Sequence, residues 1–357
     1  MAGRKREPKI DYDELLTDLE DKYGSALFDV ADQINGVIPT GSISLDIATG
    51  VGGIPRGRIS EVYGDKSTGK TTTAISIMGN ALRDGNRCAF IDMERTTTME
   101  YIKAIVGDFD ENLILFISPA TAEQALEISE TLIKSAIFSL IVFDSLGGAL
   151  LESVENSELN DNTKLAALAS LLTRWQARNS RLIKKNNVAF LFIGQVRANI
   201  GSYSRKPITP GGFALEHVLT LRIFFSHSKR IEIKDEIIGV ESFFTIDKNK
   251  AAPPHRGGSL PIIFGTGIDY HRDVLNFASN MQVIKKTGSY FKFEEETLGQ
   301  GFLNATKYLA DPENSETLDK IVKLCYNIYA SKKEDDTGED IDEWQDTGQE
   351  ELPSTEE

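Results

Sequence analysis

From Gly36 onward, short apolar runs rich in β-branched residues alternate with longer stretches whose apolar positions recur at helical spacing. The apolar runs predict strands at residues 59–63, 87–92, 113–118, 140–144 and 188–195. Helices are predicted among them at residues 71–84, 99–106, 122–136 and 164–186. Two further strand runs, 220–226 and 241–247, extend the sheet. Because such alternation is typical of a mostly parallel twisted sheet covered on both faces, the pattern predicts an α/β fold.

The pattern changes at the two ends of the chain. Ile10, Leu15, Leu16 and Leu19 recur at helical spacing and predict a short amphipathic helix over residues 10–23. A lone terminal helix must bury its apolar stripe, either on its own core or on a neighbour. We therefore expect four parts. Residues 1–35 would form an N-terminal helix with its linker, and residues 36–267 a large core. Residues 268–332 would form a small C-terminal α/β domain, and residues 333–357 a disordered acidic tail.

The composition is that of a globular protein with no membrane partner. Hydrophobic residues make up 40% of the chain, and the longest apolar stretch carries Asp144 in its middle, which indicates a buried strand. The N-terminal segment contains charges but no apolar region of the kind that secretory signals carry. Cys88 and Cys325 lie far apart, so we expect neither a disulfide framework nor a zinc cluster, and this favours a reducing cytoplasm.

Charge is distributed unevenly. The net charge of −15 argues against a nucleic-acid partner, but 12 acidic residues and no Lys or Arg lie between residue 334 and the C-terminal end. Residues 162–215, by contrast, contain no Asp or Glu and nine cations. These are Lys164, Arg174, Arg178, Arg181, Lys184, Lys185, Arg197, Arg205 and Lys206. Such a local positive field can hold phosphate groups, and Trp175 and Tyr203 add rings for base stacking. We expect single-stranded DNA here; a set of solvated helix faces is the alternative.

A phosphate-binding loop is the most specific motif. Residues 64–71 match the G-x-x-x-x-G-K-[ST] pattern at each fixed position, after a predicted strand and before a predicted helix. The loop consists of Gly64, Asp65, Lys66, Ser67, Thr68, Gly69, Lys70 and Thr71. Backbone N–H groups of such a loop surround a phosphate, and the helix N-terminus adds a favourable dipole. We therefore expect ATP, with Lys70 at the β- and γ-phosphates, the Thr71 hydroxyl on Mg²⁺, and Thr72 in the same cofactor-binding set.

Two acidic residues follow strands at the edge where open α/β sheets bind ligands. Asp144 ends the run LIVFD, and at this distance after a phosphate loop a metal-binding carboxylate is favoured over a turn cap. Glu94, just after the strand in CAFIDMER, could orient and deprotonate an attacking water; a surface acid in a loop is its alternative. Asp92 would point to the opposite side if the strand persists.

A third strand end carries Gln195 and Arg197, in the block FLFIGQVR. The segment that follows, ANIGSYSRKPITPGG, is polar and free of acidic residues, and loops of this composition are mobile unless something orders them. A glutamine close to the γ-phosphate could report hydrolysis to this loop, as nucleotide switches order other segments. A plain surface loop is the alternative.

Taken together, these blocks closely resemble the RecA family of bacterial and phage homologous recombinases. The resemblance runs from Thr40 to about Leu309 and includes CAFIDMER, LIVFDS, FIGQVRANIG, PGGFAL, KNKAAPP and GQGFLNATKYL, in that order. It implies a phosphate-loop ATPase core with an N-terminal oligomerisation helix and a small C-terminal α/β domain. The C-terminal block separates the chain from archaeal and eukaryotic recombinases. Departures near residues 96–98 and 160–210 leave open whether the gene is bacterial or phage-encoded.

The resemblance also implies roles for single residues. Glu94 would be the hydrolytic base, Asp144 would complete the Mg²⁺ site, and Gln195 would sense the γ-phosphate. Lys248 and Lys250 match a lysine pair that reaches the ATP of a neighbouring subunit, so that hydrolysis would require a filament.

Further positions match the family with departures. Tyr101 matches an adenine-stacking aromatic, but Thr98 replaces an acid usually found near it, and Gly194 stands where family members often have Asn. DNA-binding loops are implied near residues 155–163 and 199–212. The implied DNA-binding residues are Arg197, Tyr203, Arg205, Lys206, Gly211 and Gly212.

The resemblance thus implies an ATP-dependent recombinase that forms helical filaments on single-stranded DNA and exchanges homologous strands, with DNA-stimulated ATP hydrolysis. Lys285, Lys286 and Lys292 would gather double-stranded DNA at a second surface, for which the acidic tail would compete. Two alternatives belong to other classes: a RecA-fold motor or ring ATPase acting on another partner, and a filament-forming regulator that barely hydrolyses ATP. The acid-free basic stretch and the C-terminal block argue against the first, and the intact catalytic set argues against the second.

Overall fold

The computed structural model describes residues 12–23, 34–145, 161–196 and 212–335, in two units with a boundary after Ile34. The first unit contains helix α1 (Tyr12–Tyr23), which forms where the apolar spacing predicted a helix. Within the described helices, none combines the length and the apolar character that crossing a membrane requires.

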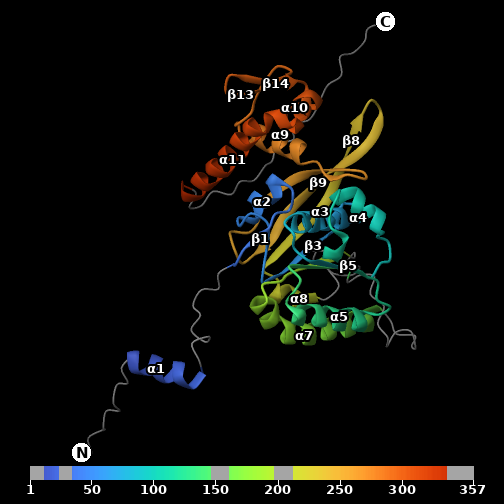
Figure 1. The fold of residues 1–357 in the computed structure, drawn as a ribbon, viewed down its shortest axis with the longest axis vertical. Coiled ribbons are helices and arrows are strands. Elements are labelled where there is room, and N and C mark those ends of the chain that lie inside the picture. The colour runs from blue at the N-terminus through green and yellow to red at the C-terminus, as the bar shows by residue number, and fades with distance from the viewer. Residues whose placement is uncertain (1–11, 24–33, 146–160, 197–211, 336–357) are drawn as a thin grey trace, which may run out of the picture. The chain divides into compact units, whose positions relative to one another are not determined.

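A nine-stranded sheet organises the second unit, in the order β11-β10-β9-β8-β3-β7-β6-β4-β5. Figure 1 shows β8 and β9 of this sheet side by side, extending beyond the helices α3 and α4. The parallel strands are β3 (Ile59–Gly64), β4 (Cys88–Asp92), β5 (Ile114–Ile117), β6 (Leu140–Asp144), β7 (Ala189–Gln195) and β8 (Leu221–Ile233). The antiparallel strands on one side are β9 (Glu236–Asn249), β10 (Gly257–Ile263) and β11 (Gly267–Ile268). The prediction of a mostly parallel sheet is confirmed.

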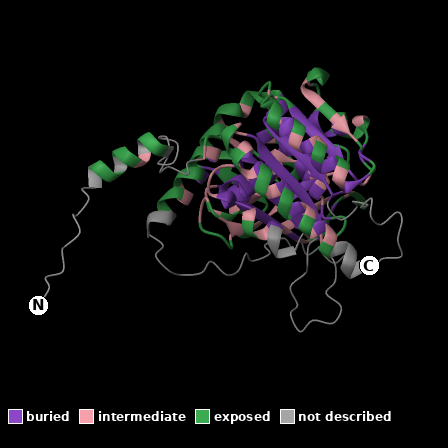
Figure 2. Ribbon diagram, turned by 90° about the horizontal axis from the view of Figure 1, so that it is seen from below, coloured by how far each residue is buried: buried purple, intermediate pink, exposed green. Residues whose placement is uncertain are grey.

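Side chains of the parallel strands alternate between two cores, one on each face. In β7, Leu191 and Ile193 join one core, whereas Phe190 and Phe192 join the other. The first core is covered by α3 (Lys70–Arg83) and α4 (Met99–Val106). The second is covered by α5 (Ala122–Ser135), α7 (Asp161–Lys185) and α8 (Gly212–Val218). Figure 2 shows the buried strands between helices whose outer faces are exposed.

The predicted helices and the first five predicted strands agree with these bounds to within three residues, but the predictions for β8 and β9 are too short. β8 and β9 form one long hairpin that turns at Lys234 and Asp235, whose φ angles are 50° and 65°. The part of β8 from His227 to Arg230 is exposed and polar, so the apolar pattern ended before the strand did.

The C-terminal part of the second unit packs on a short helix of the core. Helix α2 (Ile43–Thr49) contributes Ile43 and Ile47 to the hydrophobic core of the C-terminal helices. The Ser42 and Ser44 hydroxyls donate to the buried Asp273 carboxylate at 2.7 and 2.6 Å. The elements of this part are α9 (Tyr270–Asn280), β12 (Lys285–Thr287), β13 (Tyr290–Phe293), β14 (Glu296–Gln300), α10 (Phe302–Ala310) and α11 (Ser315–Asp335).

The smaller elements complete the fold. A two-stranded ladder of β1 (Val37–Ile38) and β2 (Ile54–Pro55) flanks α2, and 3-10 turns occur at Glu111–Leu113 and Pro312–Asn314. Helix α11 continues three residues into the predicted acidic tail, and the tail after Asp335 lies outside the described residues. The domain boundaries at residues 35, 267 and 332 remain predictions.

Candidate functional site

The phosphate-binding loop connects the end of β3 to the start of α3. Gly64 lets the backbone lie against β8, since a Cβ there would approach the Phe225 carbonyl oxygen to 1.9 Å. Gly69 has a φ of 80°, and its Cβ would meet the Ile262 side chain at 2.2 Å. Both positions therefore require glycine. Gly69 is also the N-cap of α3 and has no side chain that could occupy the first N–H groups of the helix, which leaves them for an anion.

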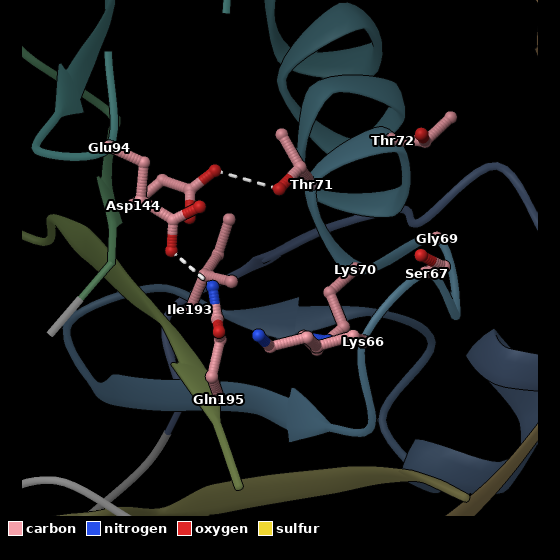
Figure 3. A pocket seen from close by; sticks show the side chains of 10 residues that line it. All are labelled: Lys66, Ser67, Gly69, Lys70, Thr71, Thr72, Glu94, Asp144, Ile193 and Gln195. Carbon is pink, nitrogen blue, oxygen red and sulfur yellow. Dashed lines mark hydrogen bonds between the residues drawn. The ribbon is translucent and has the colours of Figure 1, made fainter. Parts of the chain in front are cut away.

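A cavity of about 420 Å³ opens beside this loop (Figure 3). It is lined by Lys66, Ser67, Gly69, Lys70, Thr71, Thr72, Glu94, Asp144, Ile193 and Gln195. The structure thus brings the loop together with the carboxyl ends of β4, β6 and β7, as the sequence predicted. Of the other loop residues, Thr68 does not line the cavity: its hydroxyl donates to the Asp65 carbonyl at 2.9 Å, and its own carbonyl accepts from Ser242 at 2.8 Å.

Lys70 extends into this cavity from the first position of α3. Its ammonium group donates to the Asp65 carbonyl oxygen, and the residue is only 7% exposed. Burial lowers the pKa of Lys70 below its ordinary value, while the nearby Asp144, Asp65 and Glu94 carboxylates oppose that shift. A cation held in a poorly solvated site binds a phosphate more strongly than it would in water.

Asp144 and Thr71 meet at the opposite wall. The Thr71 hydroxyl donates to Asp144 Oδ2 at 2.7 Å. Burial, together with the Glu94 and Asp92 carboxylates, raises the pKa of Asp144 to about 7. Asp92 itself caps the turn after β4, since its oxygens accept from the N–H groups of Arg95 and Thr97 at 2.8 and 3.0 Å. The turn-capping role therefore belongs to Asp92, and Asp144 faces the cavity.

Glu94 receives two hydrogen bonds on one oxygen. Ser145, directly after β6, and Gln195, the last residue of β7, both donate to Glu94 Oε1. In Figure 3 the Glu94, Asp144 and Gln195 side chains converge opposite Lys70. Ser145 was not predicted to be a site residue. The only indication in the sequence is its position directly after Asp144, at the end of a predicted strand. The surface-acid alternative for Glu94 does not fit this geometry.

Tyr101 lies near the loop but is not part of the cavity lining. Its hydroxyl and that of Thr72 are 2.7 Å apart, and its side chain is 36% exposed. Thr98 is the N-cap of α4 and accepts from the Tyr101 N–H at 3.2 Å. At the position where an acid was expected, Thr98 therefore serves a local capping function.

Lys248 and Lys250 lie at the end of β9, apart from the cavity lining. The Lys248 ammonium donates to the Glu216 carbonyl, and that of Lys250 donates to the His217 carbonyl at 2.9 Å. Both acceptors belong to the last turn of α8, where cations are favourable. Burial and the Lys250 charge lower the pKa of Lys248.

A buried ion pair between β3 and β8 was not predicted. Arg222 on β8 donates to Glu61 on β3 at 2.7 Å, and the two side chains are 9% and 1% exposed. The Arg222 guanidinium also lies 4.0 Å from the centre of the Tyr63 ring. A Cβ at position 194 would approach Glu61 Oε1 to 2.7 Å, so Gly194 on β7 leaves room for this pair. The indication in the sequence was Glu61, a charged residue within the predicted strand ISEVY.

Of the six expected DNA-binding residues, Gly212 lies within the described part of the chain, where it begins α8. Arg197, Tyr203, Arg205, Lys206 and Gly211 lie outside the described residues. The same holds for most of the first expected loop, although residues 161–163 begin α7. On α7 five of the nine cations are exposed. These are Arg174, Arg178, Arg181, Lys184 and Lys185.

One expected stacking residue is not available to DNA. Trp175 is 2% exposed and packs against Phe190 and Phe192, and its ring N–H donates to the Ser129 hydroxyl at 2.9 Å. The prediction that Trp175 stacks on bases is therefore wrong, because the ring occupies the apolar face of α7.

The C-terminal lysines form an exposed cationic edge. Lys285 and Lys292 are cross-strand partners on β12 and β13, and Lys286 lies beside them, 5.8 Å from the centre of the Phe291 ring. Tyr290 on the same hairpin is 44% exposed. Exposed cations of this kind can contact the phosphates of nucleic acid.

Comparison with known proteins matches nearly the whole chain. The family model for the RecA N-terminal domain matches residues 12–269, and that for the RecA C-terminal domain matches residues 272–327. Protein RecA of Acholeplasma laidlawii (strain PG-8A) is 37% identical over 92% of this chain and 99% of its own length. Protein RecA of Clostridioides difficile (strain 630) is 38% identical over 84% and 86%. Protein RecA of Listeria monocytogenes serotype 4a (strain HCC23) is 35% identical over 92% and 95%.

Proposed function

This chain belongs to the RecA family, and from that premise we propose that it is a recombinase whose DNA-stimulated ATPase operates in the cavity beside residues 64–71. The observation that carries the proposal is the convergence on one cavity of Lys70, Thr71, Asp144, Glu94 and Gln195, which come from α3, β6, β4 and β7. Filament formation and strand exchange follow from the family.

The polar groups of the cavity suit a nucleoside triphosphate with Mg²⁺. Thr71 and Asp144 offer two oxygen ligands, and the crowding of Asp144 with two other carboxylates produces a site that favours added positive charge. These two residues would hold Mg²⁺, which would neutralise charge on the phosphates. Lys70 and the first N–H groups of α3 would bind the β- and γ-phosphates.

Glu94 would act as the base. In the step that we propose, the Glu94 carboxylate accepts a proton from water, the water oxygen bonds to the γ-phosphorus, and the bond between that phosphorus and the bridging oxygen of ADP breaks. The products are ADP and phosphate, and the proton passes from Glu94 to solvent. Gln195 lies within hydrogen-bonding distance of Glu94, at the cavity end of β7.

Gln195 would couple this site to DNA. It is separated by one residue from the segment 197–211, which carries the expected contacts with single-stranded DNA. A displacement of the Gln195 side chain would thus reach this segment across one residue. The strand that supports Gln195 is rigid, because β7 is buried up to Gly194. The exposed lysines of β12 and β13 would supply a second surface for double-stranded DNA, for which residues 334–357 would compete.

Neighbouring subunits would complete the site. Lys248 and Lys250 would leave the carbonyl groups of α8 and reach the triphosphate of the adjacent subunit, and α1 would dock on that neighbour. This arrangement would make turnover depend on filament formation.

The test is ATP turnover with Mg²⁺, with and without a single-stranded oligonucleotide, combined with electron microscopy of the same samples. We expect turnover to rise at least tenfold with the oligonucleotide, and filaments to form on it. Turnover that ignores the oligonucleotide, or closed rings in place of filaments, would favour the motor or ring ATPase.

A further inference from the structure

Two donors from different strands share a single oxygen of Glu94. The Ser145 hydroxyl and the Gln195 amide both donate to Oε1. Among the described residues, no donor occupies Oε2. Ser145 has no exposed surface, so water does not replace its hydrogen bond easily.

This arrangement distinguishes the two oxygens chemically. A carboxylate oxygen offers about two acceptor sites, and two donors therefore saturate Oε1. Only Oε2 can then accept a proton from water without breaking an existing hydrogen bond. A base whose other oxygen is held in place also loses less orientational freedom in the transition state.

We propose that Ser145 is a positioning residue for ATP hydrolysis: together with Gln195 it holds Oε1 of Glu94, so that Oε2 is the oxygen that takes the proton from water. This inference deepens the proposed function and rests on Glu94 as the base.

The two donors are anchored differently. Ser145 directly follows Asp144, whose carbonyl accepts from the Met93 N–H at 2.5 Å and whose side chain bonds to Thr71. Ser145 is therefore fixed by the nucleotide-binding half of the site. Gln195, in contrast, leads into the segment expected to bind DNA. The orientation of Glu94 thus depends on one donor tied to the nucleotide and one tied to DNA.

The test compares Ser145→Ala with Ser145→Thr in the full-length protein, by steady-state hydrolysis of ATP with Mg²⁺ and an oligothymidine strand. Ser145→Ala removes the donor, and we expect kcat to fall about tenfold, which is part of the rate enhancement that a general base contributes. The KM for ATP should stay within about twofold of the wild-type value. Ser145→Thr keeps the hydroxyl and should recover most of kcat. Should the extra methyl prevent folding, Ser145→Cys, with a weak donor of similar size, should give an intermediate kcat.

Ser129→Ala is the matched control. Ser129 is another fully buried serine; its hydroxyl accepts from the Trp175 ring N–H, and neither residue lines the cavity. This control should lower the melting temperature about as much as Ser145→Ala does, and it should leave kcat unchanged. A role in folding alone would predict equal effects of the two substitutions on kcat.

The outcomes separate this inference from the proposed function. A wild-type kcat in Ser145→Ala, or a loss of kcat matched by Ser129→Ala, overturns the positioning role while the ATPase proposal stands. If the unsubstituted protein shows no turnover that depends on the oligonucleotide, the proposed function fails, and the positioning role fails with it.

Discussion

Removing Arg222 should destabilise the protein strongly, because it leaves the Glu61 charge buried without its partner. Glu61 is 1% exposed and bonded to Arg222 at 2.7 Å. Breaking a buried pair by removing one member costs about 3–5 kcal/mol, much more than the loss of an exposed pair. We therefore expect Arg222→Met to lower the free energy of unfolding by about 3–5 kcal/mol.

The pH dependence of this loss has a definite sign. Burial raises the pKa of Glu61, and Arg222 opposes that rise. Without Arg222 the pKa should rise further, so the folded state holds a proton that the unfolded chain releases. Stability is then retained at low pH and lost as the pH rises through the folded pKa, and Arg222→Met should cost more at pH 8 than at pH 6.

The assay is urea unfolding of nucleotide-free protein at both pH values, with Glu61→Gln/Arg222→Met as the control. Because that double variant carries no buried charge, we expect it to recover all but about 1–2 kcal/mol of the loss. If Arg222→Met costs less than about 1 kcal/mol, or if the double variant is no more stable than the single one, the attribution to an uncompensated buried charge is wrong.

Three further predictions concern the cavity and the α2 contact. Lys70→Ala should abolish ATP-dependent DNA binding and leave the circular dichroism spectrum unchanged; normal turnover would show that the site is elsewhere. Glu94→Gln should bind ATP and single-stranded DNA but hydrolyse ATP at least 100-fold more slowly than the wild type. Its filaments should therefore last longer in electron microscopy, and wild-type filament lifetimes would count against Glu94 as the base. Burial raises the pKa of Asp46 to about 7, so stability present at low pH is lost as the pH rises through that value. Asp46→Asn should remove this pH dependence and raise the free energy of unfolding at pH 8 by up to about 4 kcal/mol, measured by urea unfolding. Superimposable pH profiles of the variant and the wild type would refute this prediction.

Features encoded by short segments could be predicted from the sequence. The loop at residues 64–71 and the strand-end residues Glu94, Asp144 and Gln195 needed only a strand, a turn and a helix in the correct order. Parallel strands deliver their carboxyl ends to one edge of a sheet, so the predicted order of elements already implied that these side chains would meet.

Features that depend on pairing between distant segments could not be predicted. Glu61 finds Arg222 only because β3 and β8 are neighbours, which the sequence does not show. Trp175 lies in a basic stretch, yet the helical phase of α7 turns its ring into the core. Ser145 is one of many serines, and only the proximity of β4 to β6 places its hydroxyl on Glu94.

The full length of the hairpin formed by β8 and β9 could not be predicted either. Along β8 and β9, cross-strand pairing continues through exposed polar residues such as Ser228 and Lys229, where hydrophobic patterning gives no signal. The segment 197–211 carries the expected DNA contacts and lies outside the described residues, so its register remains a prediction.

In the proposed function, a nucleotide in the cavity controls the affinity for single-stranded DNA through Gln195. The most direct measurement is the affinity for a fluorescent oligothymidine strand with Mg²⁺ and either a non-hydrolysable ATP analogue or ADP, at one fixed salt concentration. We predict at least tenfold tighter binding with the ATP analogue, and the loss of that difference in Gln195→Ala. Equal affinities of the wild-type protein in the two nucleotide states would contradict the account.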